Sequence, residues 1–177
     1  MKIYVVSGGP GTGKTSVIKE LKNRGYAVLF ETARYLAESD KRFVEKSIKE
    51  INMYDFQHSI FKFQKEQFKN LRYGGEGPIF SDRGLGDTLA FMKVNNIGIP
   101  EEYLTFSKKF NHLPVFMLEP LGFYEKDELR QESEDEQKEI HKQIIKAYEN
   151  LGHAILPVSI MPVRERADFI IENIQNI

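Results

Sequence analysis

The 177 residues carry a formal net charge of −1, and 41 % of them are hydrophobic and 29 % charged, close to the composition of an average globular protein. A chain of this length buries about 70 % of the surface that it exposes when unfolded, so we expect one domain over residues 1–177. The near-neutral charge gives no general attraction to nucleic acid or to a membrane surface, and neither is expected as a partner. The sequence has no cysteine, which excludes thiolate metal sites, so metal ligands are expected to be oxygen atoms.

The first apolar run and the histidines indicate neither a targeting segment nor a metal centre. Glycines interrupt the apolar run at residues 3–6 after a few positions, so it is predicted to be neither a signal peptide nor a membrane span, and a cytoplasmic protein is expected. The four histidines lie far apart and are interpreted as ordinary surface or core residues: His58, His112, His141 and His153.

Short apolar strands are predicted to alternate with helices along the chain. The expected strands cover residues 2–6, 27–30, 79–81, 114–118 and 154–156. The expected helices cover residues 33–37, 53–73, 87–94, 101–110, 133–150 and 163–174, together with one that starts near Gly13 and ends at residues 23–25. Parallel neighbours require crossover connections, so this alternation favours an α/β fold with a five-stranded parallel sheet and helices on both faces. Ligands of such sheets bind at the carboxyl ends of the strands.

Two helices carry further signals. Apolar side chains recur at three- and four-residue steps from Met53 to Phe68, which indicates core packing and leaves one or two rings to border a ligand pocket. Asp87 is expected to cap the helix that ends at Val94.

Residues 8–15, GGPGTGKT, satisfy the pattern G-x-x-x-x-G-K-[ST] between a predicted strand and a predicted helix, the context of a P-loop. Its backbone N–H groups and the helix N-terminus favour phosphate oxygens, while Lys14 is expected to reach the β and γ phosphates and Thr15 to ligate Mg²⁺. ATP is the expected nucleotide, and GTP stays open. The residues expected to bind it are Gly8, Gly9, Pro10, Gly11, Thr12, Gly13, Lys14, Thr15 and Ser16.

Polar residues follow the second and third strands, where they are expected to face the P-loop. Asp82 is predicted to hold Mg²⁺ and Arg83 to neutralise phosphoryl oxygens. Glu31 is predicted to accept the proton of an attacking hydroxyl, and Arg34 to face the same acceptor. The alternative for Glu31 is that it complements the N-terminus of the next helix.

The charged segment at residues 125–136 has two interpretations. Such segments are usually solvated surface. Phosphoryl transfer, however, needs a cover that excludes water and brings an arginine over the phosphates, and Arg130 is the one arginine in the segment. We therefore expect a small helical lid around residues 121–136, with Arg130 as a catalytic residue.

With these motifs in order, the chain resembles a P-loop kinase-like group named for an AAA-type ATPase domain. This group is similar to the ribosylnicotinamide kinase domain of bacterial NAD-biosynthesis regulators and, more distantly, to deoxynucleoside and thymidylate kinases. The resemblance implies the strand order 2-3-1-4-5, an acceptor-side role for Glu31, and a base-bordering loop that contains Val158 and Ser159. It rests on SGGPGTGKT at 7–15, FETAR at 30–34, FSDRGLGDT at 80–88, LEP and FYEKDELR within 118–130, and PVSIMPVRERADFI at 157–170.

The expected function is transfer of the γ-phosphoryl group of Mg-ATP to a small nucleoside- or nucleotide-like acceptor. The sequence lacks the Asp-Glu pair found at the end of a Walker B strand, and it leaves no residues for a helical lid domain with sensor motifs. Both observations argue against a remodelling motor. The Asn-Lys-x-Asp guanine motif of signalling GTPases is also missing. A nucleotide-dependent switch that acts through a protein partner remains the alternative, and homodimer formation stays open.

Overall fold

Five parallel strands form the centre of the protein in the order β2-β3-β1-β4-β5, which confirms the expected fold class and strand order. The computed structural model describes residues 2–44, 46, 49–71, 77–110, 113–122 and 133–175. The strands are β1 (Lys2–Ser7), β2 (Ala27–Leu29), β3 (Pro78–Asp82), β4 (Val115–Leu118) and β5 (Ile155–Val158).

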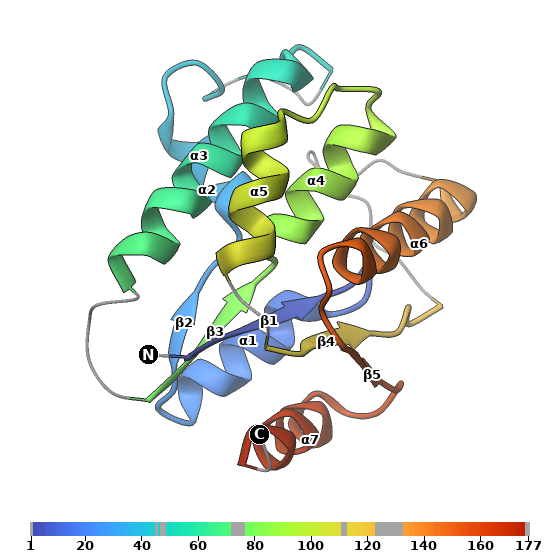
Figure 1. Ribbon diagram of the computed structural model, residues 1–177. Coiled ribbons are helices and arrows are strands. Elements are labelled where there is room, and N and C mark those ends of the chain that lie inside the picture. The colour runs from blue at the N-terminus through green and yellow to red at the C-terminus, as the bar shows by residue number, and fades with distance from the viewer. Residues whose placement is uncertain are drawn as a thin grey trace.

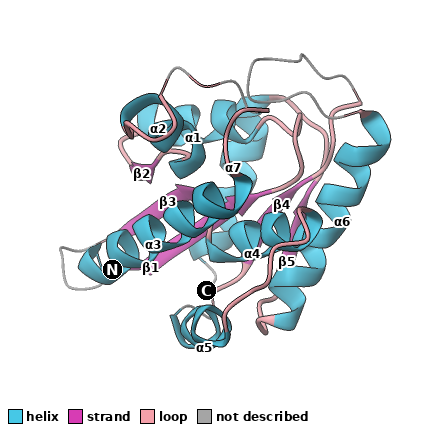
Figure 2. Cartoon of the chain, turned by 90° about the horizontal axis from the view of Figure 1, so that it is seen from above, coloured by secondary structure: helices cyan, strands magenta, loops and turns pink. Residues whose placement is uncertain are grey.

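Helices cover both faces of the sheet (Figure 1). Two helices, α1 (Lys14–Asn23) and α7 (Val163–Gln175), lie together below it. The opposite layer consists of α3 (Met53–Leu71), α4 (Leu85–Val94), α5 (Glu101–Phe110) and α6 (Glu134–Asn150). In this layer α4 lies between α3 and α6 (Figure 2), and α2 (Thr32–Ser39) packs on α3.

Strand β1 supports both helical layers because successive side chains of a strand point to opposite faces. Tyr4 and Val6 are buried in the core that contains the apolar residues of α1 and α7. Ile3 faces the other way, against α3, α4 and α5, and Val5 packs with α4 and α6. A strand buried on both faces requires a continuous apolar run, which is what β1 has.

The apolar stripe of α3 is core, as predicted. Phe56, Ile60 and Phe68 are buried beneath neighbouring helices. Two glutamines of the same helix, Gln57 and Gln64, are buried as well, so this face of α3 is not uniformly apolar.

Several element boundaries differ from the predictions. Helix α4 begins at Leu85, so Asp87 caps it from the third helical position, within a capping box, and not from in front of it. Strand β5 ends at Val158 and not at residue 156, while α2 extends from Thr32 to Ser39. The predicted end of α3 at residue 73 lies outside the described residues. Residues 123–132, which contain most of the expected lid and Arg130, lie outside the described residues.

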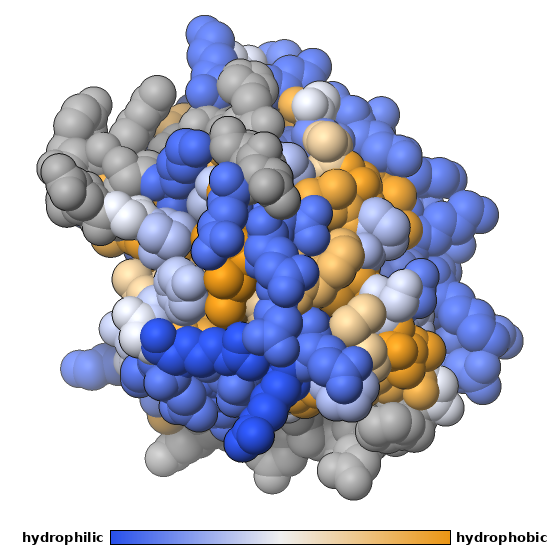
Figure 3. Space-filling model, turned by 90° about the horizontal axis from the view of Figure 1, so that it is seen from below, coloured by the Kyte–Doolittle hydropathy of each residue, from blue (hydrophilic) through white to orange (hydrophobic). Residues whose placement is uncertain are grey.

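Seen from below, the face that α1 and α7 cover carries many hydrophilic side chains with smaller hydrophobic areas between them (Figure 3). This mixture is expected for helices that bury one side only. Among the described residues, no helix has the length and apolar character needed to cross a membrane.

Candidate functional site

The P-loop connects β1 to α1 at the carboxyl edge of the sheet. Gly8 and Gly13 have φ angles of 145° and 82°, in the region that side chains rarely adopt. A Cβ atom on Gly8 would lie 2.7 Å from the carbonyl oxygen of Leu118 on β4. The loop can therefore lie this close to the sheet only because the position is glycine.

Lys14 lies inside the loop that it follows. Its Nζ atom donates to the carbonyl oxygens of Gly8 at 2.9 Å and Gly9 at 2.7 Å, and to Thr12 Oγ1 at 3.2 Å. Burial, and after it the Arg83 guanidinium, lower the pKa of Lys14 to about 7. Phosphate oxygens in the loop would favour the charged ammonium and replace these carbonyl partners.

Thr15 and Asp82 form a pair that fits a magnesium ion. Thr15 Oγ1 donates to Asp82 Oδ2 at 3.1 Å, while Asp82 Oδ1 is buried and makes no hydrogen bond with any described residue. Burial and the charge of Glu31 raise the pKa of the Asp82 carboxyl to about 6. A hydroxyl and a carboxylate with an unsatisfied oxygen are suitable ligands for Mg²⁺, which takes few protein ligands and binds substrate phosphates as well.

Arg83 joins the two carboxylates that flank it. Its Nε atom donates to Glu31 Oε1 at 2.8 Å and its Nη1 atom to Asp87 Oδ1 at 3.2 Å. Arg83 has a φ angle of 72°, uncommon for a residue with a side chain, and hydrogen bonds hold its backbone to Val6 and Ser81. Glu31 is the N-cap residue of α2, but its side chain makes no capping hydrogen bond there. Its carboxylate is therefore oriented by Arg83, while its charge still lies at the N-terminus of α2, as the alternative interpretation expected.

Asp87 caps α4 from its third position, through the Gly84 N–H, and is also a buried centre of hydrogen bonds. Besides the Arg83 guanidinium, its carboxylate accepts from Ser7 Oγ at 2.7 Å, from the Gly84 N–H at 2.9 Å and from Tyr148 Oη at 2.5 Å. Burial and the Asp87 charge raise the pKa of Tyr148 well above its ordinary value, so the phenol stays a donor. The network sets the position of Arg83 from three different elements.

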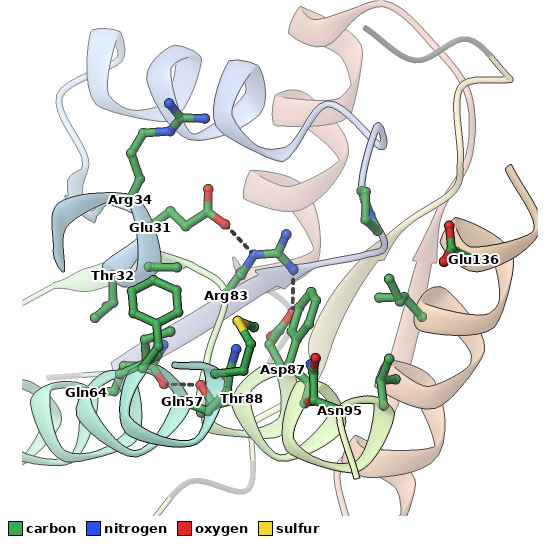
Figure 4. A pocket seen from close by; sticks show the side chains of 18 of the residues that line it. Glu31, Thr32, Arg34, Gln57, Gln64, Arg83, Asp87, Thr88, Asn95 and Glu136 are labelled. Carbon is green, nitrogen blue, oxygen red and sulfur yellow. Dashed lines mark hydrogen bonds and ion pairs between the residues drawn. The ribbon is translucent and has the colours of Figure 1, made fainter. Parts of the chain in front are cut away.

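A cavity of about 440 Å³ lies beside this cluster (Figure 4). Pro10 of the P-loop lines one side, and Glu31 and Arg83 line another. The apolar part of the wall comes from Met53, Phe56, Ile60, Phe91, Val94 and Ile140. Phe56 thus confirms that a ring of the α3 stripe borders a pocket. Thr88 donates to Gln64 Oε1 at 2.9 Å, which leaves the Gln64 amide NH₂ as a donor, and the neighbouring Gln57 also faces the cavity.

The remaining predicted site residues differ in whether they line the cavity, lie on the surface or are buried in the core. Arg34 lines the cavity, but its side chain is 41 % exposed, its Nη1 atom lies 4.0 Å from Glu38, and it points away from Arg83 (Figure 4). Ser16 is exposed on α1. The Val158 side chain is buried in the core with α1 and α7, because β5 extends to this residue, so only its backbone is left to border a nucleotide base. Ser159 follows directly in the loop.

The sequence interpretation missed two residues that contact the P-loop. His141 of α6 accepts a hydrogen bond from the Gly9 N–H through Nδ1 at 3.0 Å, so it is not an ordinary surface or core histidine. Burial, and after it Lys14, lower the pKa of His141, which keeps Nδ1 available as an acceptor. Arg166 of α7 donates to the Thr12 carbonyl at 2.6 Å. Both contacts join segments more than a hundred residues apart, and no local motif signals them.

The sequence matches the family described as an AAA domain over residues 3–166. The chain belongs to this AAA domain family. The matched range of the AAA domain contains the P-loop, Glu31, Asp82, Arg83 and Arg166. No curated protein matches the sequence.

Solved structures share the fold of this AAA domain over almost its whole length. Deoxyadenosine kinase from M. mycoides, with products dCMP and dCDP bound, has a TM-score of 0.66 at 19 % identity, with 100 % of both chains covered. The NadR protein in complex with NR has a TM-score of 0.69 at 19 % identity. The comparison covers 97 % of this chain and 49 % of NadR, so the chain spans about half the length of NadR. Thymidylate kinase from Candida albicans has a TM-score of 0.68 at 13 % identity, with 99 % of this chain and 91 % of the kinase covered. The AAA domain therefore has a P-loop kinase-like fold, which confirms the resemblance.

The Asp82→Asn variant is expected to unfold at a higher temperature than the wild-type AAA domain at pH 8 without Mg²⁺. Glu31, Asp82 and Asp87 face the cation Arg83 and a Lys14 whose pKa of about 7 leaves it mostly neutral at pH 8, so the buried cluster carries negative charge in excess. Removing that charge is expected to raise the unfolding midpoint by roughly 2–6 °C.

The sign of the pH dependence follows from the raised pKa of Asp82. A carboxyl that binds its proton more tightly when folded confers stability below its unfolded pKa of 3.8, and this stability is lost as pH rises through about 6. Thermal denaturation at pH 5 and pH 8 checks this: the advantage of the Asn variant should be smaller at pH 5. Mg-ADP should then stabilise wild type more than the variant. A variant that melts below wild type at pH 8 would contradict this description of the cluster.

Proposed function

We propose that the chain is an ATP-dependent kinase that phosphorylates a hydroxyl group of a small nucleoside-like molecule bound in the cavity. One observation carries the proposal: Glu31 lines the cavity and at the same time accepts a hydrogen bond from Arg83, beside the P-loop. A carboxylate in this position suits a group that receives the proton of an attacking hydroxyl. The kinase-like fold and the nucleotides dATP and AMP-PNP bound to solved relatives support it.

Each residue then has a distinct role in one displacement. The acceptor oxygen attacks the γ-phosphorus, the bond to the β–γ bridging oxygen breaks, ADP leaves, and the acceptor proton passes to Glu31. Lys14 and Arg83 neutralise charge on the transferring group. Thr15 and Asp82 would hold a magnesium ion that binds phosphate oxygens. Arg130, outside the described residues, is proposed to add a further positive charge from a lid that closes over this single domain.

The charges around the cavity favour an acceptor without a phosphate group. Four carboxylates line it, from Glu31, Asp87, Glu136 and Glu139, against the two guanidinium groups of Arg34 and Arg83. Arg83 is already bound by two of these carboxylates. A nucleoside monophosphate would bring two negative charges into this surrounding, whereas a nucleoside would bring none.

The cavity wall suits a ring that carries polar groups at its edge. Phe56, Ile60 and Phe91 offer apolar surface, and Gln57, which is 4 % exposed, adds a side-chain amide to the wall. An amide offers both a carbonyl acceptor and an NH₂ donor, so it suits a ligand with a donor and an acceptor at its ring edge. A nucleobase has this chemistry.

ADP release with Mg-ATP tests the proposal, measured without acceptor and with separate pools of nucleosides and of nucleoside monophosphates. We expect stimulation of at least about tenfold by the nucleoside pool alone. Stimulation by the monophosphate pool alone would refute the choice of a hydroxyl acceptor. Slow release that no pool changes would instead support a nucleotide switch acting through a protein partner.

A further inference from the structure

Arg166 of α7 is the largest of the fully buried side chains in the described part of the protein, with 1 % exposure, and it lies behind the P-loop. Its guanidinium binds three backbone carbonyls. Nη1 donates to Thr12 at 2.6 Å, Nε to Ser159 at 3.1 Å and Nη2 to Glu119 at 3.5 Å. One side chain therefore connects the P-loop with the segments that follow β4 and β5.

The positive charge of Arg166 has no carboxylate partner within ion-pair distance among the described residues, in contrast to Arg83. Burial lowers the pKa of the guanidinium, but an arginine side chain keeps its proton in proteins. The charge of Glu119 acts on the guanidinium in the opposite direction to burial, without forming an ion pair with it. A buried cation that carbonyl dipoles and one more distant carboxylate compensate is costly for folding. This cost would be offset when an anion binds on the other side of the loop.

The hydrogen bond to Thr12 also determines where the next N–H points. In a trans peptide unit the carbonyl oxygen and the following N–H point to opposite sides. Because Arg166 binds the Thr12 carbonyl from outside the loop, the Gly13 N–H is directed inward. This N–H donates to no described group, and a Cβ atom on Gly13 would lie 3.6 Å from Arg166 Nη1. The guanidinium thus lies directly against the peptide unit that it orients.

We propose that Arg166 is a positioning residue for the phosphate-binding loop. It holds the Thr12–Gly13 peptide so that the Gly13 N–H faces a nucleotide phosphate, polarises that N–H through the carbonyl, and adds positive charge behind the loop. Through Ser159 it holds the segment expected to border the base in the same arrangement. The inference rests on the proposed nucleotide binding by the P-loop but not on the identity of the acceptor.

Equilibrium binding of ADP with Mg²⁺, measured by calorimetry, tests this role in wild type and in Arg166→Met, Arg166→Lys and Arg164→Met. Arg164 is exposed two residues earlier on α7, so its variant is a matched loss of one positive charge. We expect Arg166→Met to bind ADP about 10- to 100-fold more weakly, from the typical strength of a charged hydrogen bond. Arg166→Lys should show an intermediate loss, and Arg164→Met should bind like wild type.

The amide ¹⁵N chemical shift of Gly13 gives a second readout that a general loss of stability would not move. The shift depends on the hydrogen bond to the preceding carbonyl, so Arg166→Met without nucleotide should displace it while leaving distant core amides unchanged. If Arg166→Met does not fold, Arg166→Lys provides both measurements. ADP affinity within about twofold of wild type, or an unmoved Gly13 shift, would overturn the inference. Absence of ADP binding by wild type would refute the proposed function of the P-loop instead.

Discussion

Replacing Lys14 with methionine is expected to lower γ-phosphoryl transfer by about 10³-fold or more. The ammonium is the buried cation of the P-loop, 4 % exposed, and no other lysine lies inside it among the described residues. Removing one charged or hydrogen-bonding group that stabilises a transition state typically costs about 10²- to 10³-fold, and a lysine that contacts two phosphates contributes at least that. The rate of product formation at saturating ATP measures the effect.

The folded state should survive the Lys14→Met change. Burial lowers the pKa of Lys14 from 10.5 to about 7, so the stability linked to this group is present above pH 10.5 and is lost as pH falls through 7. At pH 7 the charged side chain therefore weakens the fold, and methionine should leave the melting temperature unchanged or raise it. Lys19→Met, on the exposed side of α1, is the control and should keep full activity. Activity of Lys14→Met near that of wild type would exclude this P-loop as the catalytic phosphate site.

Replacing Glu31 with glutamine is expected to reduce acceptor-dependent turnover by about 10²- to 10⁴-fold, the usual contribution of a general base. The amide oxygen of glutamine can still accept the hydrogen bond from Arg83 Nε, which is 2.8 Å from Glu31 Oε1. The substitution therefore removes the ability to take a proton while it keeps the arginine in place. Initial rates with and without acceptor, together with ADP affinity, separate the two effects.

ADP affinity should change less than about threefold in Glu31→Gln, because the carboxylate faces the cavity and not the inside of the P-loop. Glu38→Gln is the matched control: this carboxylate lies on α2, the helix that Glu31 precedes, is 67 % exposed, and pairs with Arg34. It should keep its turnover. An equal loss of activity in both variants, or a loss of ADP binding in Glu31→Gln, would assign Glu31 to the structure of the site and not to proton transfer.

Local patterns predicted most of the fold. The continuous apolar run of β1 and the three- and four-residue spacing in α3 each indicate the buried faces that the structure has. The P-loop is contiguous, so its position between β1 and α1 also followed from the sequence. Boundaries were less predictable, because Leu85 and Val158 extend their elements through tertiary packing.

The unpredicted part of the candidate site depends on contacts between distant segments. The capping role of Asp87 followed from its neighbours in the sequence, whereas Ser7 and Tyr148, which also donate to its carboxylate, lie 80 and 61 residues away. His141 and Arg166 reach the P-loop from α6 and α7 in the same way. None of these residue types carries a local signal at its position, so only the folded chain brings them together.

The measurement that tests the kinase proposal most directly is the fate of the γ-phosphoryl group. Wild-type protein is incubated with γ-labelled ATP, Mg²⁺ and a pool of nucleosides, and the labelled products are separated from inorganic phosphate. The arrangement of Glu31, Arg83 and the P-loop beside the cavity predicts label in a nucleoside monophosphate, formed far more slowly by Lys14→Met. Label that appears only in inorganic phosphate, at a rate that no nucleoside changes, would contradict phosphoryl transfer to an acceptor in this cavity.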